Sequence, residues 1–153
     1  MKSFDNDLQF QLHDLARVLR TRFDRWARTY GLTRAQGVIL VRLHHQPGLS
    51  QNEMAALCEV EPITVGRLVD RLEARGLLER RPDPGDRRIN RLHLLAAAQP
   101  ILALIDDYRA ELGEQILGDV PAEKRAIVLE VLQHMKTKIT MEAAGTPLAA
   151  AGE

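Results

Sequence analysis

The sequence predicts a mainly α-helical fold with one small β-hairpin. Through most of the 153 residues, apolar side chains recur at steps of three and four, which is typical of amphipathic helices. One stretch departs from this period: the β-capable runs LLERR and RRINRLHLL flank PDPGD, a loop rich in proline and glycine. Two such runs around such a loop predict a hairpin.

The first predicted element is a long helix from about Asp7 to Tyr30. Its large apolar residues share one face at helical spacing: Leu8, Leu12, Leu15, Leu19, Phe23, Trp26 and Tyr30. Gly31 is expected to end this helix, because glycine readily adopts the left-handed conformation that closes helices.

Two capping boxes predict the next two helices. Thr33 and Gln36 have the spacing at which each side chain can bond the other residue's free backbone amide, which starts a helix through VILVRLHH. Ser50 and Glu53 repeat this spacing at the start of the short helix NEMAALC. Residue types at the helix starts therefore predict where both helices begin.

A fourth helix, residues 62–75, follows a turn of three or four residues, with Pro62 at a favoured first position and Gly76 as its stop. After the hairpin, a further helix should contain Pro100 in its first turn, since a proline deeper inside would break the hydrogen-bond ladder. A last helix is expected over residues 122–140. A short helix, a tight turn, a second helix and a hairpin make a winged helix-turn-helix.

The predicted domain organisation follows from these elements. Residues 1–31 form an N-terminal helical region, and residues 32–95 form the winged helix-turn-helix lobe. Residues 96–140 form two C-terminal helices, and residues 141–153 have too little to bury and are expected to be a disordered tail. Because both terminal regions carry apolar helix faces, we expect them to be dimerisation helices that join two copies of the chain.

Charge is unevenly distributed, although the formal net charge is zero. Residues 1–31 carry 6 Lys and Arg against 4 Asp and Glu, residues 32–95 carry 10 against 8, and residues 96–153 carry 5 against 9. Five arginines crowd the hairpin beside two aspartates: Arg80, Arg81, Arg87, Arg88 and Arg91 with Asp83 and Asp86. A neutral chain can thus carry a basic working face. The alternative is a salt-bridged hairpin that binds no ligand.

Several classes of protein are disfavoured. No apolar run approaches the roughly 18 residues of a membrane span, and MKSFDNDLQF has acids where a signal peptide would be apolar, so a cytoplasmic protein is expected. We find no phosphate-binding glycine loop, metal-ligand cluster or nucleophile motif, so we expect neither an enzyme nor a cofactor or metal site. Cys58, the single cysteine, is expected to be a buried packing residue, with a peroxide-sensing thiol as the alternative.

The helix over residues 62–75 has an outer face suited to DNA. A helical wheel puts Val65, Leu68, Val69 and Leu72 on its buried side. Of its exposed front, Arg67 can bond guanine bidentately and Thr64 can pack its methyl group on thymine. Gly66 lies at the flank, where the absence of a Cβ would let the backbone approach DNA closely. The alternative is a solvated charged face with Gly66 as a flaw, but the adjoining basic hairpin favours DNA.

With these residues placed, the sequence resembles the MarR family of bacterial transcriptional regulators. Three stretches match the family's central pattern in order and without gaps: GLTRAQGVILVRL, GLSQNEMAALCEVEPITVGRLVDRLEARGLLERRPDPGDRR and RLHLL. The resemblance implies a homodimer that reads an inverted repeat in double-stranded DNA, and we expect a repressor because such dimers commonly occlude promoters. A winged-helix module that compacts DNA or binds proteins, without a ligand response, is the alternative function.

The resemblance also implies roles for individual residues. Asp86 and Arg88 form the family's D-x-R signature, in which the aspartate braces an arginine that enters the minor groove; Arg87 is an equally suitable tip residue. Asp70 is expected to pair with an arginine near the base of the wing. The expected DNA contacts, with Thr64 and Arg67 as base readers, are Ser50, Gln51, Pro62, Ile63, Thr64, Gly66, Arg67, Arg71, Arg87 and Arg88.

Many members of this family release DNA when a small aromatic or phenolic anion binds between the dimer helices and the winged lobe. Trp26, Tyr30 and Gly37 are the candidates to border such a cleft here. The favoured alternative is that Gly37 permits close helix packing and that the two aromatic residues belong to the core. The sequence departs from the family at Leu95, where a threonine usually caps the next helix, so that helix is expected to begin without this cap.

Overall fold

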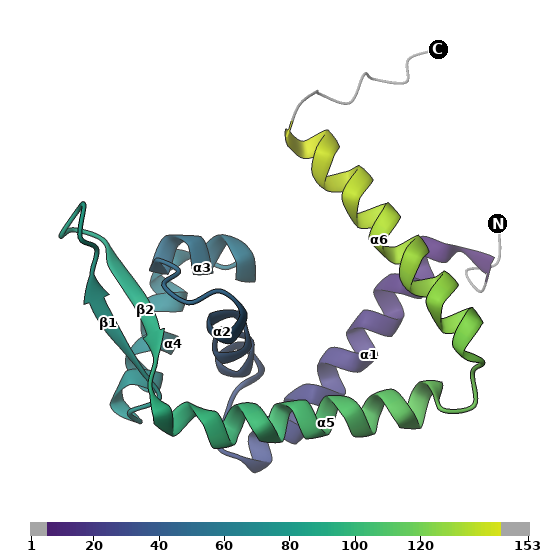
Figure 1. The fold of residues 1–153 in the computed structure, drawn as a ribbon, viewed down its shortest axis with the longest axis horizontal. Coiled ribbons are helices and arrows are strands. Elements are labelled where there is room, and N and C mark those ends of the chain that lie inside the picture. The colour runs from purple at the N-terminus through teal and green to yellow at the C-terminus, as the bar shows by residue number, and fades with distance from the viewer. Residues whose placement is uncertain (1–5, 145–153) are drawn as a thin grey trace. The chain divides into compact units, whose positions relative to one another are not determined.

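A computed structural model describes residues 6–144 of the chain. Its elements in chain order are α1 (Leu8–Thr29), α2 (Arg34–His45), α3 (Gln51–Cys58), α4 (Pro62–Ala74), β1 (Leu78–Pro82), β2 (Asn90–Leu94), the 3₁₀ helix η2 (Ala96–Ala98), α5 (Gln99–Leu117) and α6 (Ala122–Ala144) (Figure 1). The two strands form one antiparallel hairpin. The predicted fold class, mainly helical with a small β-hairpin wing, is confirmed.

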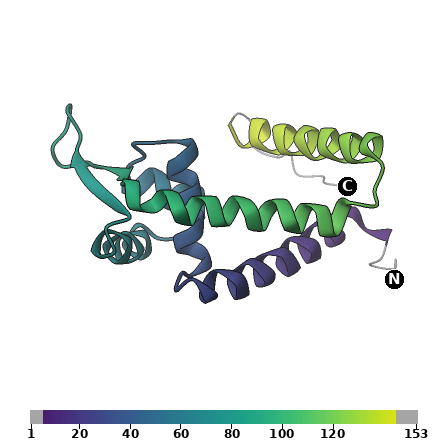
Figure 2. The ribbon, with the colours of Figure 1, turned by 60° about the horizontal axis from the view of Figure 1, so that its bottom comes forward.

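The chain divides into two compact units, residues 1–106 and residues 107–153, and the division falls inside α5. The first unit contains α1 to α4, the hairpin, η2 and the beginning of α5. Within this unit the hairpin projects beyond the neighbouring helices, as two ribbon views show (Figures 1 and 2). The second unit consists of the rest of α5 and α6.

The core of the first unit is built mainly from α2, α3, α4 and both strands, with further residues from α1, α5 and the connecting loops. Its largest buried residues are Leu32, Ile39, Leu40, Leu43, Met54, Val65, Val69, Leu72, Leu78 and Leu92. Burial of each such side chain stabilises the fold by about 1.5–3 kcal/mol. Because α4 turns Val65, Val69 and Leu72 inward, its opposite side faces solvent, as the wheel predicts. Leu68, which the wheel also places inside, is half-buried against this core.

Strand β2 lies between β1 and the loop that leads into α3. Leu78 of β1 pairs with Leu94 of β2. On the other edge of β2, the amide of Leu92 donates to the carbonyl oxygen of Leu49 at 2.9 Å, and the carbonyl of Leu92 accepts from the amide of Gly48 at 3.0 Å. Backbone hydrogen bonds therefore join the wing directly to the helix-turn-helix.

The helix starts agree with the sequence predictions. Both capping boxes form: Thr33 Oγ1 accepts from the amide of Gln36 at 3.2 Å, and Ser50 Oγ accepts from the amide of Glu53 at 3.2 Å, each with its reciprocal bond. Pro62 is the first residue of α4. Caps of this kind stabilise a helix by about 0.5–2 kcal/mol each, so they define the start of α2 and α3.

The chain leaves the wing without a side-chain cap, as the departure at Leu95 predicts. One turn of 3₁₀ helix, Ala96–Ala98, comes before α5. Pro100 lies in the first turn of α5, as predicted, where its missing amide costs no hydrogen bond of the helix.

Helix α6 extends to Ala144, beyond the predicted end at Thr140, because the residues MEAA that follow include good helix formers. The remainder of the predicted tail, residues 145–153, lies outside the described residues. Large apolar side chains of α6 are exposed in the single chain: Ile127, Val128, Leu129, Val131, Leu132, Ile139 and Met141. Over residues 6–144, no helix combines the length and apolar character needed to cross a bilayer.

Candidate nucleic-acid interface

The outer side of α4 presents a row of exposed side chains near its start. Ile63 is 66% exposed, and Thr64, Arg67 and Arg71 are also exposed. The helix begins at Pro62, so these side chains belong to its first turns. In a helix-turn-helix, residues at this position of the second helix are the ones that can reach base edges in a major groove.

Gly66 lies where α3 and α4 approach each other, and its missing side chain makes room for Gln51. A Cβ at Gly66 would lie 3.0 Å from Nε2 of Gln51. The same nitrogen donates a hydrogen bond to the carbonyl oxygen of Pro62 at 3.3 Å. From the sequence, the missing Cβ at Gly66 is expected to let the helix backbone approach DNA closely. In the structure a side chain of α3 occupies it, because the two helices pack closely.

Arg80 ties strand β1 to a solvent-accessible flank of α4. Its Nη2 donates to Asp70 Oδ1 at 2.6 Å and to the carbonyl oxygen of Gly66 at 3.4 Å, and its Nη1 pairs with Glu73. The amide of Arg80 donates to Oε1 of Glu73 at 3.1 Å. The expected pairing of Asp70 with an arginine at the base of the wing is thus present. Glu73 was not expected there, although it lies one turn after Asp70 on the same helix face.

Arg91 ties strand β2 to the start of α3. Its Nη1 donates to Glu53 Oε2 at 2.9 Å and to the carbonyl oxygen of Gly48 at 3.2 Å. Its Nε donates to Asp83 Oδ2 at 2.6 Å. Arg80 and Arg91 count as basic hairpin residues in the sequence, but in the structure their guanidinium groups make internal contacts. The charge count alone therefore overstates how many arginines of the wing can reach a ligand.

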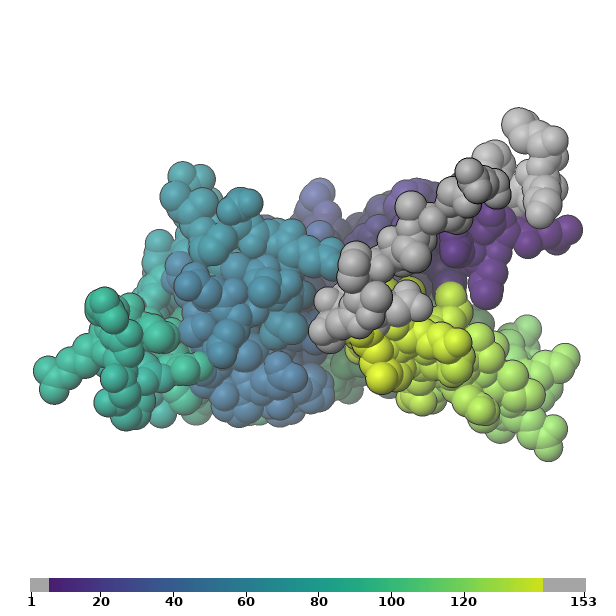
Figure 3. Space-filling model, turned by 90° about the horizontal axis from the view of Figure 1, so that it is seen from above, coloured from purple at the N-terminus to yellow at the C-terminus, as the bar shows by residue number. Residues whose placement is uncertain are grey.

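The tip of the wing holds Arg88 in a bidentate pair with Asp86. Arg88 Nε donates to Asp86 Oδ1 and Arg88 Nη2 donates to Asp86 Oδ2, both at 3.1 Å, while the side chain of Arg88 remains 90% exposed. Hydrogen bonds from the Arg88 side chain, and then from its amide, lower the pKa of Asp86. Arg87 is exposed and makes no ion pair in the part of the chain that the structure describes. The space-filling view shows this tip as a projection from the lobe (Figure 3).

A polar hollow of about 220 Å³ separates the start of α3 from the wing. It is lined by Ser50, Gln51, Asn52, Arg88, Ile89 and Asn90. Ser50, a predicted DNA contact, is 9% exposed. Its Oγ already accepts the hydrogen bond that caps α3. Asn52 and Asn90 are exposed amide side chains that were not predicted for the site. Their signal in the sequence is weak, because nothing local indicates that both line one hollow.

The three residues expected to border a ligand cleft lie in a packed region. The rings of Trp26 and Tyr30 are in contact in a tilted arrangement, with centroids 4.9 Å apart and an interplanar angle of 50°, and Tyr30 is 41% exposed. Gly37 is buried, and a Cβ there would lie 3.0 Å from the ring of Phe23. The contact of Gly37 with Phe23 is close packing between α1 and α2, as the favoured alternative from the sequence has it. Of the two aromatic residues, Trp26 packs against the core, whereas the exposed Tyr30 does not belong to it.

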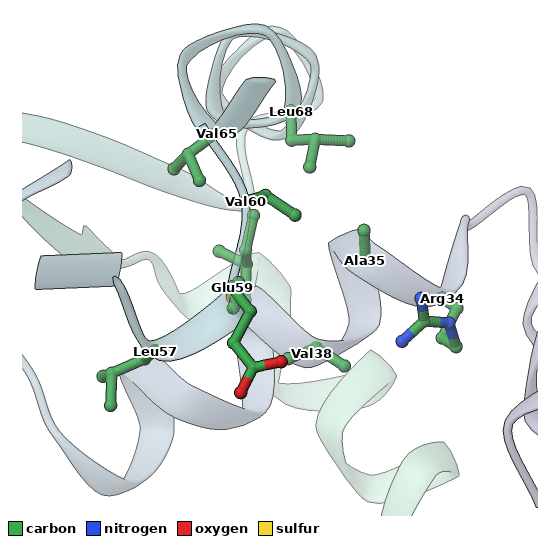
Figure 4. Close-up of a pocket in the computed structure, with 10 residues that line it drawn as sticks. Arg34, Ala35, Val38, Leu57, Glu59, Val60, Val65 and Leu68 are labelled. Atoms are coloured by element: carbon green, nitrogen blue, oxygen red, sulfur yellow. The ribbon is translucent and has the colours of Figure 1, made fainter. Parts of the chain in front are cut away.

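A cavity of about 180 Å³ lies between α2, α3 and the inner side of α4 (Figure 4). Its lining is mostly apolar: Arg34, Ala35, Val38, Ile39, Leu57, Cys58, Glu59, Val60, Val65 and Leu68. Figure 4 shows Val65 and Leu68 of α4 on one side and Val38 and Leu57 on the other. Trp26, Tyr30 and Gly37 are not among the lining residues.

Cys58 is half-buried in the lining of this cavity, with its Sγ 3.7 Å from Sδ of Met54. Burial raises the pKa of the Cys58 thiol, which outweighs the opposing effect of Arg42 and Arg34. A raised pKa keeps the thiol protonated at neutral pH, and a protonated thiol is a poor nucleophile. Within residues 6–144 no group of three or more His, Cys, Asp or Glu side chains is placed to hold a metal ion.

The short α3, the tight turn, the exposed α4 and the projecting hairpin define a winged helix-turn-helix protein. Residues 32–89 match the model of the MarR family. The crystal structure of MarR is similar to this chain with a TM-score of 0.81 and 26% identity, over 94% of this chain and 97% of that chain. The transcriptional regulator SlyA has the same fold, with a TM-score of 0.77 and 23% identity over 90% of this chain and 96% of its own.

A relative in Bacillus subtilis strain 168, the uncharacterized HTH-type transcriptional regulator YdgJ, is 23% identical over 137 residues, which cover 90% of this chain and 82% of the relative. Residues 32–89 thus carry a domain of the MarR family, which confirms the resemblance seen in the sequence. The fold is that of a winged-helix transcriptional regulator.

Proposed function

We propose that this regulator binds an inverted-repeat operator in double-stranded DNA as a homodimer and represses transcription there. The distribution of ion pairs among its arginines supports this function. Arg80 and Arg91 make internal contacts, whereas Arg67, Arg71 and Arg87 make no ion pair with any described residue. Unpaired cations on the outer side of α4 and on the wing are suited to the phosphates that border a DNA groove.

Each group of residues has a distinct task in this proposal. Arg67 bonds a guanine edge, while Thr64 and Ile63 pack on thymine methyl groups, because they form the exposed front of α4. Arg71 contacts the adjacent phosphates. The wing tip, Arg87 and Arg88, follows the backbone or enters the minor groove. Around this front, Ser50, Gln51, Pro62 and Gly66 set the distance between α3, α4 and the DNA backbone.

The homodimer is supported by the exposed apolar residues of the terminal helices. On α1, Leu8 and Leu15 are 57% and 53% exposed. On α6, the consecutive residues Ile127, Val128 and Leu129 are each more than half exposed. Exposed apolar surface of this extent marks a protein–protein contact. Two copies of the chain would bring two winged lobes to the two halves of an inverted repeat.

A selection from random DNA tests the proposal. Fragments bound by the full chain should converge on an inverted repeat, and the affinity for the repeat should exceed that for a scrambled sequence by about 10³-fold or more. Arg67→Ala should lose this preference, while Arg42→Ala, an exposed arginine on α2, should keep it. Binding without sequence preference would instead support the DNA-compacting alternative.

A small aromatic ligand is proposed to relieve the repression by entering the cavity behind α4 with its ring. The volume of about 180 Å³ is close to the roughly 150 Å³ of an apolar cavity that holds benzene. An occupant would press on Val65 and Leu68 and so move the face that carries Arg67. We expect small aromatic carboxylates to release the operator, and Val38→Phe, which fills the cavity, to prevent their effect. Release that persists in Val38→Phe would place the ligand elsewhere.

A further inference from the structure

Arg91 connects three segments that are distant from one another in the chain. Its guanidinium reaches Glu53 at the start of α3 at 2.9 Å, Gly48 in the loop before α3 at 3.2 Å, and Asp83 at the beginning of the wing turn at 2.6 Å. Its side chain is 32% exposed. The backbone of Arg91 also forms a β-bridge with Ser50, which caps α3.

Both acidic partners of Arg91 hold other parts of the structure in place. Glu53 Oε2 accepts from the amide of Ser50 at 2.6 Å, which completes the capping box. Asp83 Oδ1 accepts from the amides of Gly85 at 2.7 Å and Asp86 at 3.1 Å, which shapes the wing turn. The hydrogen bonds to Ser50 and the pairing with Arg91 lower the pKa of Glu53, and the bonds from Arg91, Gly85 and Asp86 lower that of Asp83.

The network continues from Asp83 to the tip of the wing. Asp86, whose amide is bound by Asp83, accepts from the amide of Arg88 at 3.0 Å and from its guanidinium. Hydrogen bonds thus run without interruption from the cap of α3 through Arg91 to Arg88. A two-stranded hairpin is only marginally stable by itself, so contacts of this kind decide where its tip lies.

We propose that Arg91 is a positioning residue for DNA binding: it contacts no DNA but fixes the wing relative to α3 and α4. The inference rests on the proposed function, because it concerns the placement of Arg87 and Arg88 relative to Arg67. Its Nε and Nη1 already donate to two carboxylates and a carbonyl, so its charge is neutralised locally. Holding the wing in place before DNA arrives removes an ordering cost that a loose wing would meet on binding.

The test compares Arg91→Met with Arg88→Ala in the full chain. Arg91→Met keeps an unbranched stem like that of arginine but removes the guanidinium group and with it every side-chain hydrogen-bond donor. We expect it to weaken operator binding roughly tenfold, as for contacts coupled within one network. The slope of log K against log salt should stay as in the wild type, because no phosphate contact is lost. Arg88→Ala should instead reduce that slope by about 1.

Hydrogen exchange in the free protein gives a readout that does not depend on DNA. In Arg91→Met, amides of residues 83–89 should exchange faster, while those of α2 and α4 remain as in the wild type. Asp83→Asn, a milder change, should act in the same direction and add nothing to Arg91→Met. It also serves as the test if Arg91→Met does not fold.

Three results would overturn the inference: unchanged operator affinity, unchanged exchange of the wing amides, or a salt slope reduced by about 1 in Arg91→Met, which would make Arg91 a phosphate contact. Failure of the proposed function has a different signature. In that case the wild-type chain itself shows no sequence preference, while the exchange experiment still reports whether Arg91 holds the wing.

Discussion

The amide group of Gln51 occupies the space that a side chain at Gly66 would fill, with Nε2 only 3.0 Å from an added Cβ. The contact joins the start of α3 to the first turns of α4, because the same nitrogen donates to the carbonyl oxygen of Pro62. A glycine inside a helix costs about 1 kcal/mol relative to alanine. Glycine at position 66 leaves room for the Gln51 side chain between α3 and α4, so its cost in helix propensity is offset by this contact.

Gly66→Ala should therefore change DNA binding more than stability. The gain in helix propensity of about 1 kcal/mol offsets the loss of one hydrogen bond, about 0.5–1.5 kcal/mol, so the free energy of unfolding should stay within about 1 kcal/mol of the wild type. The displaced Gln51 should weaken operator binding. Urea denaturation and binding titrations measure both quantities.

Gly113→Ala in α5, where an added Cβ meets nothing within 4 Å, is the matched control and should only stabilise. Undiminished binding by Gly66→Ala would mean that the Gln51 contact has no part in DNA recognition.

Arg67→Ala and Arg88→Ala should affect DNA binding in different ways. Arg67 lies on the exposed front of α4, so its loss should cost about 1–3 kcal/mol at the operator and little on scrambled DNA. Arg88 lies at the wing tip, so its loss should weaken binding to both DNAs more evenly. Titrations with operator and scrambled DNA at several salt concentrations distinguish the two. An equal loss on both DNAs for Arg67→Ala would remove it from the base readers.

Local patterns in the sequence predict the helices well, whereas contacts between residues that are distant in the chain leave no such pattern. The capping boxes at Thr33 and Ser50 depend on residues three positions apart, so they can be recognised before any fold is known. The partners of Arg91 lie 38 residues away at Glu53 and 8 residues away at Asp83. Which arginine of the hairpin pairs internally depends on this tertiary arrangement, and the sequence shows only the charges. The position of Gln51 beside Gly66 is hidden for the same reason.

The acidic residues of the wing network should make its order depend on pH. The pKa of Asp83 lies below its ordinary value of 3.8, and that of Glu53 lies below 4.5. A carboxyl whose pKa is lowered by folding stabilises the fold above its unfolded pKa, and this contribution is lost as pH falls through the folded pKa. The wing should thus be fully braced at neutral pH and loosen below about pH 4. Carboxyl titrations by NMR should give midpoints below those ordinary values. A midpoint at or above 3.8 for Asp83 would show that Arg91 does not hold it in solution.

Glu73 and Asp70 should contribute unequally to the attachment of β1. Glu73 bonds both the side chain and the amide of Arg80, whereas Asp70 is 65% exposed and bonds the side chain alone. Glu73→Gln should therefore lower the free energy of unfolding by about 1–2 kcal/mol, and Asp70→Asn by less than about 1 kcal/mol. Chemical denaturation of the two variants measures the difference. A larger effect for Asp70→Asn would reverse this order.

The exposed apolar residues of α6 should decide the oligomeric state. Val128 and Leu129 are each 57% exposed in the single chain, although a helix of a monomer would bury or replace such side chains. Val128→Asp with Leu132→Asp should convert a dimer into a monomer at micromolar concentration, because burying two carboxylates in an apolar contact is costly. Mass measurement by light scattering reports this directly, and Lys136→Glu on the same helix is the control for the change in charge.

Loss of dimerisation should also weaken operator binding, since one winged lobe reads only half of an inverted repeat. A wild-type chain that is monomeric at micromolar concentration would rule out this account of α6.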